Sequence, residues 1–219
     1  MSLSAFPSLE AAIIDLDGTL VDTLGDFDAA LNAVLAEMRL PALSRTAIES
    51  MVGKGSDHLI RSALSAVGGA PDRYEEAWAA YQRHYAACNG RHAQVYPGAL
   101  ECLERLRERG WPLACVTNKP GQFAHDLLQS KGLRHFFGHV FGGDAFERKK
   151  PDPQPLLGAC AALGTLPVNT LMVGDSINDA QAARAAGCPV MLVTYGYNHG
   201  HDVRTVDADG WLSSLADLP

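Results

Sequence analysis

The sequence has few cysteines, no excess of basic residues and no long apolar run. Its five cysteines are odd in number and include no Cys-x-x-Cys pair, so we interpret them as free thiols rather than zinc ligands or a disulfide framework. Lys and Arg total 18 against 25 Asp and Glu, a net charge of −7, which excludes the basic footprint of a nucleic-acid-binding protein. No stretch reaches the ~18 apolar residues of a transmembrane helix, and residues 1–10 lack a secretory signal pattern. We therefore expect a cytoplasmic protein without a nucleic-acid or membrane partner.

What remains is an ordinary globular composition, with 47% hydrophobic residues in a chain of 219. Short apolar runs rich in β-branched residues predict strands at 11–16, 112–117, 170–174 and 189–194, with a weaker one at 139–141. Helical patterns lie between them at 97–109, 122–131, 155–163 and 180–186, and a glycine follows each one, as is typical of helix C-termini. This alternation predicts an α/β fold with a doubly wound parallel sheet covered on both faces.

Residues 22–91 break the alternation and show helical periodicity only. An all-helical block of this length between the first two long strands predicts an inserted helical domain. One of its apolar stripes is aromatic and is interpreted as a packing surface; it consists of Tyr74, Trp78, Tyr81 and Tyr85.

The sequence DLDGT at residues 15–19 directly follows the first predicted strand. Its carboxylates, Asp15 and Asp17, repel each other where the chain leaves the core. A divalent cation offsets this repulsion, and oxygen donors without a nearby His or Cys favour Mg²⁺ over zinc. Gly18 permits a sharp turn whose N–H groups can face an anion. The alternative is an ordinary acidic turn.

Three further motifs lie farther along the chain: VTNKP at 116–120, KKPDP at 149–153 and VGDSIND at 173–179. Each alone has an ordinary explanation as turn chemistry, a solvated lysine pair or a helix cap. Together with DLDGT they place polar side chains at the carboxyl ends of parallel strands, where ligand sites of doubly wound sheets form. One shared site explains all four better than four coincidences. The candidate side chains are Thr117, Asn118, Lys150, Asp175 and Asp179.

The four motifs resemble those of the haloacid dehalogenase superfamily of phosphotransferases, and the resemblance covers the whole chain. The KKPDP segment, the loop at 52–55 and the length look like the phosphoglycolate phosphatase group within it. The resemblance implies a Rossmann-like core of residues 1–21 and 92–219 with a helical cap domain, residues 22–91, inserted after the first motif.

The resemblance also implies the chemistry of the first motif. Asp15 is expected to be the nucleophile that forms an aspartyl-phosphate, which divides one difficult displacement into two. Asp17 is expected to protonate the leaving group and then to activate water. Mg²⁺ is expected to be bound by Asp15, Asp175 and the backbone carbonyl of Asp17, where it screens the repulsion between Asp15 and the phosphate.

The same resemblance assigns the phosphate oxygens to Thr117, Asn118 and Lys150, which hold them as charge redistributes. Asp179 is expected to orient Lys150 or the residues around the metal.

Substrate specificity is expected from the cap. A small acidic leaving group such as glycolate needs a cation, and Lys54, His58 and Arg61 lie on or beside the glycine-rich loop. Lys54 is our first choice because glycines flank it, whereas for His58 and Arg61 a solvated helix face is the alternative. His199 and His201 are interpreted as surface residues.

The sequence thus predicts a Mg²⁺-dependent phosphate monoester hydrolase acting on a small phosphorylated metabolite, with 2-phosphoglycolate as the expected substrate. Alternatives that stay open are a sugar phosphate, an amino-sugar phosphate or pyrophosphate as substrate, a sugar-phosphate mutase, and a non-enzymatic sensor of a phosphorylated ligand. A monomer or a homodimer is expected.

Overall fold

Six parallel strands form the centre of the protein in the computed structural model, which describes residues 8–218. Five of them were predicted from the sequence, whereas the edge strand β8 was missed because Gly-Trp-Leu is too short to show periodicity. Across the sheet the strands follow in the order β5 (His139–Phe141), β4 (Leu113–Val116), β1 (Ala11–Ile14), β6 (Thr170–Gly174), β7 (Val190–Val193) and β8 (Gly210–Leu212).

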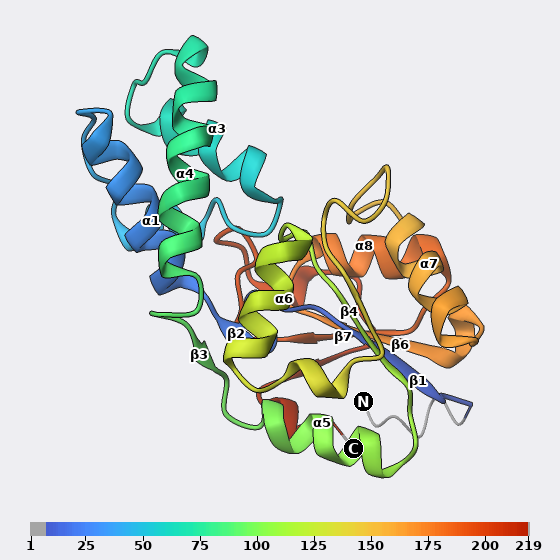
Figure 1. Ribbon diagram of the computed structural model, residues 1–219. Coiled ribbons are helices and arrows are strands. Elements are labelled where there is room, and N and C mark those ends of the chain that lie inside the picture. The colour runs from blue at the N-terminus through green and yellow to red at the C-terminus, as the bar shows by residue number, and fades with distance from the viewer. Residues whose placement is uncertain (1–7, 219) are drawn as a thin grey trace.

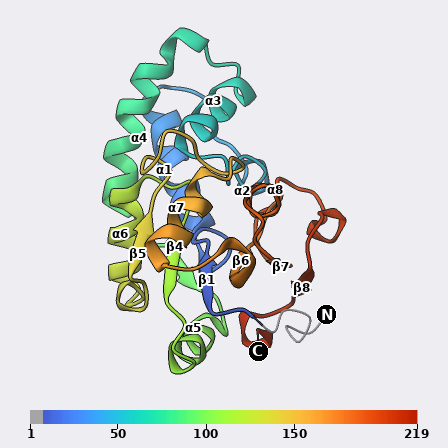
Figure 2. The same cartoon turned by 90° about the vertical axis from the view of Figure 1, so that its right-hand side faces the viewer.

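Helices cover both faces of this sheet, as the α/β prediction requires (Figures 1 and 2). Successive strand residues point to opposite faces, so Ile14 packs in one buried cluster and Ile13 in another. The first cluster includes helices α5 (Ala99–Glu108) and α6 (Gly121–Ser130), and the second includes α7 (Gln154–Leu163) and α8 (Ile177–Ala186). The fold is therefore α/β with a doubly wound parallel sheet.

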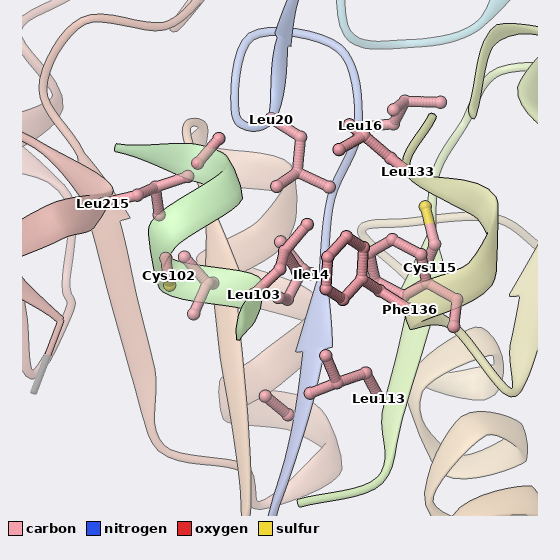
Figure 3. Close-up of a cluster of buried hydrophobic side chains, with 14 of the residues drawn as sticks. Ile14, Leu16, Leu20, Cys102, Leu103, Leu113, Cys115, Leu133, Phe136 and Leu215 are labelled. Carbon is pink, nitrogen blue, oxygen red and sulfur yellow. The ribbon is translucent and has the colours of Figure 1, made fainter. Parts of the chain in front are cut away.

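The first of these clusters anchors the strand that carries the DLDGT motif. Figure 3 shows side chains of β1, β4 and α5 meeting there. Ile14, Leu16 and Leu20 are fully buried, so the chain is fixed on both sides of Asp15 and Asp17. The four glycines predicted to end helices all have positive φ, between 71° and 83°; they are Gly110, Gly132, Gly164 and Gly187.

Helices α1 (Leu24–Glu37), α2 (Arg45–Glu49), α3 (Ser56–Ala66) and α4 (Tyr74–Cys88) form a separate group beyond the carboxyl end of β1 (Figure 1). They have their own buried cluster. Two short antiparallel strands, β2 (Val21–Asp22) and β3 (Gln94–Val95), lead into and out of the group. Buried Asp26 ties the two ends together, because its carboxylate accepts hydrogen bonds from Gly90 N at 2.6 Å and His92 N at 2.7 Å. We refer to α1–α4 as the cap helices.

Short 3₁₀ helices complete the chain at Pro71–Arg73, Arg134–Phe136, Pro167–Asn169, Val203–Thr205 and Leu215–Asp217. All five cysteines are free thiols, as predicted. Within residues 8–218, no helix has the length and apolar character needed to cross a bilayer.

Candidate active site

A small cavity of about 30 Å³ lies between the carboxyl ends of the strands and the cap helices. That volume holds about two water molecules, so the cap helices lie closely against the sheet. The core side of the wall comes from the first and second motifs, and the other side from α1, α3, α4 and the loop at 52–55. The lining residues from the core are Asp15, Asp17, Thr117, Asn118 and Lys119.

Asp15 follows β1 and is buried beside Lys150, whose Nζ lies 3.0 Å from Asp15 Oδ1. Burial raises the pKa of Asp15 to about 7, although Lys150 opposes the shift. Lys150 Nζ also donates to Asp179 Oδ1 and to the carbonyl of Val116, both at 2.7 Å. Burial lowers the pKa of Lys150, but the two carboxylates outweigh it and the net pKa is raised. Lys150 therefore stays charged and holds Asp15 in place from behind, outside the cavity wall.

The carboxylates of Asp15, Asp175 and Asp179 approach one another within 4.8 Å and are all buried. Burial and the two neighbouring carboxylates raise the pKa of Asp175 well above its ordinary value. Three carboxylates face one ammonium group here, so the cluster lacks positive charge. This donor set of hard oxygens fits Mg²⁺.

Within the cluster, Asp179 has little capacity left for a metal ion. Its Oδ1 accepts from Lys150, and its Oδ2 accepts from Asp175 N, Ser176 N and Ser176 Oγ. Asp179 thus contacts both Lys150 and the Asp175 loop and fixes their positions relative to each other. Asp15 and Asp175 are the carboxylates with free acceptor positions.

Two glycines press against the Asp175 carboxylate. A Cβ at Gly18, where φ is +83°, would overlap Asp175 Oδ2, and one at Gly196 would overlap Asp175 and the carbonyl of Gly18. The backbone N–H of Tyr197 donates to Asp175 Oδ2, and its hydroxyl contacts Asp22 and two backbone N–H groups at the start of α1. Tyr197 links the acidic cluster to the first cap helix, and no local motif marked it in the sequence.

Asp17 lies opposite Asp15 and pairs with Lys119. Lys119 Nζ lies 2.9 Å from Asp17 Oδ1 and 3.3 Å from Oδ2, and it also donates to the hydroxyl of Tyr85. Sequence reasoning quoted Lys119 in the VTNKP motif but gave it no role. It also interpreted the aromatic stripe as packing surface, whereas Tyr81 and Tyr85 of that stripe line the cavity. The signal that could have found Lys119 is its position three residues beyond the end of β4, directly after Thr117 and Asn118.

Thr117 lines the cavity, and its Oγ1 accepts from Lys119 N at 3.2 Å. The side chain of Asn118 is used differently from our expectation. Its Nδ2 donates to the carbonyl of Lys150 at 2.9 Å and to that of Gly53 in the cap at 3.0 Å. Asn178 Nδ2 also donates to Gly53 O, at 3.2 Å. Asn118 therefore holds the cap loop against the core.

None of the three cap cations expected to bind substrate lines the cavity. Lys54 is exposed, and His58 is partly buried with its pKa lowered by burial and by nearby Lys54. Arg61 is exposed on the outer surface, where it pairs with Asp57 at 3.0 Å and stacks on Tyr74. The apolar face of α3 packs in the buried cluster of the cap helices, so its polar positions point away from that cluster.

His199 also differs from its interpretation as a surface residue. It is partly buried near the cap loop, with Nε2 3.2 Å from Asn178 Nδ2, and burial followed by Lys54 lowers its pKa. His201 is exposed, as expected.

Comparison with known proteins agrees with this geometry. A family model for haloacid dehalogenase-like hydrolases matches residues 12–193. The chain belongs to this hydrolase family. It is 40% identical to the phosphoglycolate phosphatase of Thiobacillus denitrificans, over 98% of this chain and 96% of that protein, and 44% identical to that of Nitrosospira multiformis, over 94% and 92%.

Among solved structures, a predicted phosphoglycolate phosphatase from Haemophilus somnus superposes with a TM-score of 0.92 at 32% identity, covering 96% of each chain. The expected family, fold class and hydrolase activity are thereby confirmed. The family membership also explains why all four strand-end motifs occur in one chain.

Proposed function

We propose that this hydrolase cleaves 2-phosphoglycolate to glycolate and phosphate through an aspartyl-phosphate on Asp15. One observation carries the proposal: two carboxylates, Asp15 and Asp17, line the same small cavity, and each lies beside its own buried lysine. Two carboxylates in separate surroundings can take different roles in one reaction. The choice of 2-phosphoglycolate as the substrate is based on the relatives named phosphoglycolate phosphatase.

In the first step, an Asp15 carboxylate oxygen attacks the phosphorus atom and the bond to the glycolate oxygen breaks. Lys150 and Asp179 fix the position of Asp15, and the hydroxyl of Thr117 donates to a phosphate oxygen. Asp17 enters this step protonated and gives its proton to the departing oxygen, which a poor leaving group such as an alkoxide requires. Asp17 thereby becomes a carboxylate, which Lys119 holds within the cavity wall.

In the second step, Asp17 takes a proton from a water molecule that attacks the phosphorus atom of the aspartyl-phosphate. Phosphate leaves and Asp15 is restored. The apolar side chains of the cap helices limit the water that reaches the intermediate.

Mg²⁺ is the proposed cofactor, and Asp15, Asp175 and the backbone carbonyl of Asp17 would hold it. When bound, it supplies positive charge that offsets the repulsion between Asp15 and the phosphate. The buried excess of carboxylates around Lys150 supports this assignment.

A cavity of about 30 Å³ is smaller than the substrate, so entry requires the cap helices to move away from the sheet. We propose residues 22–91 as a cap domain that moves about β2 and β3, with residues 1–21 and 92–219 as the core domain. Gly53 O is one of the contacts that hold the cap closed, because it accepts from Asn118 and Asn178 of the core.

The proposal is tested by measuring phosphate release with and without Mg²⁺ from 2-phosphoglycolate, glucose 6-phosphate, glucosamine 6-phosphate, pyrophosphate and p-nitrophenyl phosphate. We expect the kcat/KM for 2-phosphoglycolate to exceed the others by about 100-fold, which corresponds to ~2.7 kcal/mol of transition-state preference. A sugar phosphate as the leading substrate would overturn the proposed substrate. Release that is independent of Mg²⁺ would overturn the proposed cofactor.

The remaining expectations concern the protein in the cell. We propose a small phosphorylated metabolite as its partner, a cytoplasmic location, and a monomer or homodimer.

A further inference from the structure

Lys119 is the one cationic residue among residues 8–218 that lines the cavity. The second buried lysine of the site, Lys150, donates to Val116 O and Asp179 and lies 3.0 Å from Asp15 Oδ1. Lys150 does not line the cavity, so an anion there meets Lys119 first.

Lys119 lies deep in the site but reaches the cavity. Its side chain is only 2% exposed, and its ammonium group donates to Asp17 Oδ1 at 2.9 Å, to Asp17 Oδ2 at 3.3 Å and to the hydroxyl of Tyr85. The rings of Phe27 and Tyr85 lie 5.0 and 4.8 Å from Nζ, a distance at which aromatic faces attract a cation. The longer contact, with Asp17 Oδ2, is the one that an incoming anion can replace, in a pocket whose lining residues on the cap side are uncharged.

The position of Lys119 suits an anion on the leaving group. Asp17 must come within hydrogen-bonding distance of the ester oxygen that it protonates. In a glycolate leaving group, the carboxylate oxygens lie about 3 Å from that ester oxygen, as bond lengths dictate. Lys119 Nζ lies 2.9 Å from Asp17 Oδ1. It is therefore within hydrogen-bonding distance of the position that the substrate carboxylate must occupy.

The cap offers no competing cation in the cavity. Val52, Leu59 and Tyr81 line its cap side, together with small residues. Lys54 and Arg61 are exposed outside it. An incoming carboxylate binds a buried, partly neutralised ammonium group more tightly than an exposed one, because water competes less for the charges inside the protein.

We propose that Lys119, with the Tyr85 hydroxyl beside it, binds the carboxylate of the leaving group and selects acidic phosphate esters. This proposal rests on the proposed function, because it names the residue that recognises the carboxylate of that substrate. Lys119 holds Asp17 before the substrate arrives, and it shares its protons between Asp17 and the substrate carboxylate afterwards.

The test compares 2-phosphoglycolate with 2-phosphoglycolamide, in which a neutral amide replaces the carboxylate. Wild-type protein, Lys119→Met and Tyr85→Phe are assayed with both esters and Mg²⁺. Tyr74→Phe is the matched control, because it also removes a hydroxyl from α4. That hydroxyl donates to Asp57 on the outer surface.

We expect wild type to prefer 2-phosphoglycolate by about 100-fold in kcat/KM and Lys119→Met to lose that preference. Tyr85→Phe, which keeps every charge, should lower it about fivefold, and Tyr74→Phe should leave it unchanged. An equal fall for both esters in Lys119→Met, or an unchanged ratio in both site variants, would overturn the proposal, because Lys119 would then only position Asp17.

A second readout separates this proposal from the proposed function. Glycolate is added as an inhibitor of p-nitrophenyl phosphate hydrolysis, which does not require 2-phosphoglycolate to be the substrate. Competitive inhibition of wild type that weakens at least tenfold in Lys119→Met and Tyr85→Phe supports carboxylate binding at Lys119. Equal inhibition of all three proteins contradicts it, even where 2-phosphoglycolate proves to be the best substrate.

Discussion

The two walls of the cavity differ in polarity and in how their side chains are held. The core wall is charged, and its aspartates each pair with a buried lysine. The cap wall is mostly apolar and aromatic, and its polar contacts with the core include those of the Gly53 carbonyl and the Tyr85 hydroxyl. The difference indicates a division of labour, in which the core supplies the charges for catalysis and recognition and the cap supplies enclosure.

The largest expected effect is on the core wall. Asp15→Asn removes the proposed nucleophile, and kcat should fall by at least ~10⁴-fold, as when an essential nucleophile is lost in other enzymes. The melting temperature should not fall, because the variant removes one of three crowded carboxylates. Steady-state kinetics and thermal unfolding measure both. A kcat within tenfold of wild type would remove Asp15 from the mechanism.

The core side of this comparison was largely predictable from the sequence, because each candidate directly follows a buried strand. Parallel strands bring their carboxyl ends together, and so Asp15 and Asp175 meet although they are far apart in the chain. The carboxyl ends of the five predicted strands lie within two residues of the observed ones, and the glycines marked the helix ends. Short elements such as β8 lack a periodic signal.

The cap side was less predictable, because its contacts depend on tertiary structure. Tyr85 and Lys119 are separated by 34 positions, and Gly53 and Asn178 by 125. Nothing local to Lys54 or Arg61 shows that their side chains lie outside the cavity. The direction of these side chains depends on which face of α3 is buried, and the packing of the four cap helices determines that face.

Lys150→Met tests how much the core wall depends on its buried cation. Removing it leaves Asp15 and Asp179 without their partner, which costs about 3 kcal/mol in such sites, or a fall of roughly 6–12 °C in melting temperature. Lys149→Met is the matched control, because this neighbouring lysine is exposed, and it should change the melting temperature by less than about 1 °C. Equal effects of the two variants would contradict the role of Lys150.

Metal removal tests the acidic cluster. In metal-free protein, burial raises the folded-state pKa of Asp15 to about 7. Burial and the neighbouring carboxylates also raise the pKa of Asp175 well above its ordinary value. The folded state then binds protons that the unfolded state releases, so the unfolding free energy falls as pH rises from about 4 to about 7. Mg²⁺ at 100 times its dissociation constant should restore about 2.7 kcal/mol above pH 7.

Thermal unfolding with EDTA or with Mg²⁺ across this pH range measures the effect. The Mg²⁺-induced shift should be larger at high pH, since protons compete with the metal. Asp175→Asn should abolish it. A shift that is the same at both ends of the range would rule out the cluster as the binding site.

The cap loop offers a smaller and more specific test. At Gly55, φ is +86° and a Cβ would meet Lys149 Nζ at 2.8 Å and Asn118 O at 3.2 Å. Gly55→Ala should raise KM about tenfold by displacing the loop, a change of ~1.4 kcal/mol. Gly68→Ala is the control, because Gly68 has φ of +70° but nothing within 4 Å. Gly68→Ala should lower the free energy of unfolding by about 1 kcal/mol and leave KM unchanged. If Gly68→Ala raised KM as much as Gly55→Ala, backbone strain alone would explain both increases.

The smallest expected effect concerns the outer surface of the cap. Arg61→Ala removes an exposed pair with Asp57, which contributes at most ~0.5 kcal/mol, and KM for 2-phosphoglycolate should change less than twofold. A tenfold increase in KM would show that Arg61 reaches the substrate when the cap moves, and would weaken the contrast between the two walls.

The most direct test of the core's role is to trap the phosphorylated enzyme. Asp17→Asn should still accept phosphate from p-nitrophenyl phosphate, whose leaving group needs no proton, but hydrolyse the intermediate slowly, since it lacks the base for water. The protein is mixed with p-nitrophenyl phosphate and Mg²⁺, quenched in acid, digested and analysed by mass spectrometry. The account predicts phosphate on the peptide that contains Asp15, at that residue. Active wild-type protein with no phosphopeptide in either form, or phosphate on another residue, would contradict it.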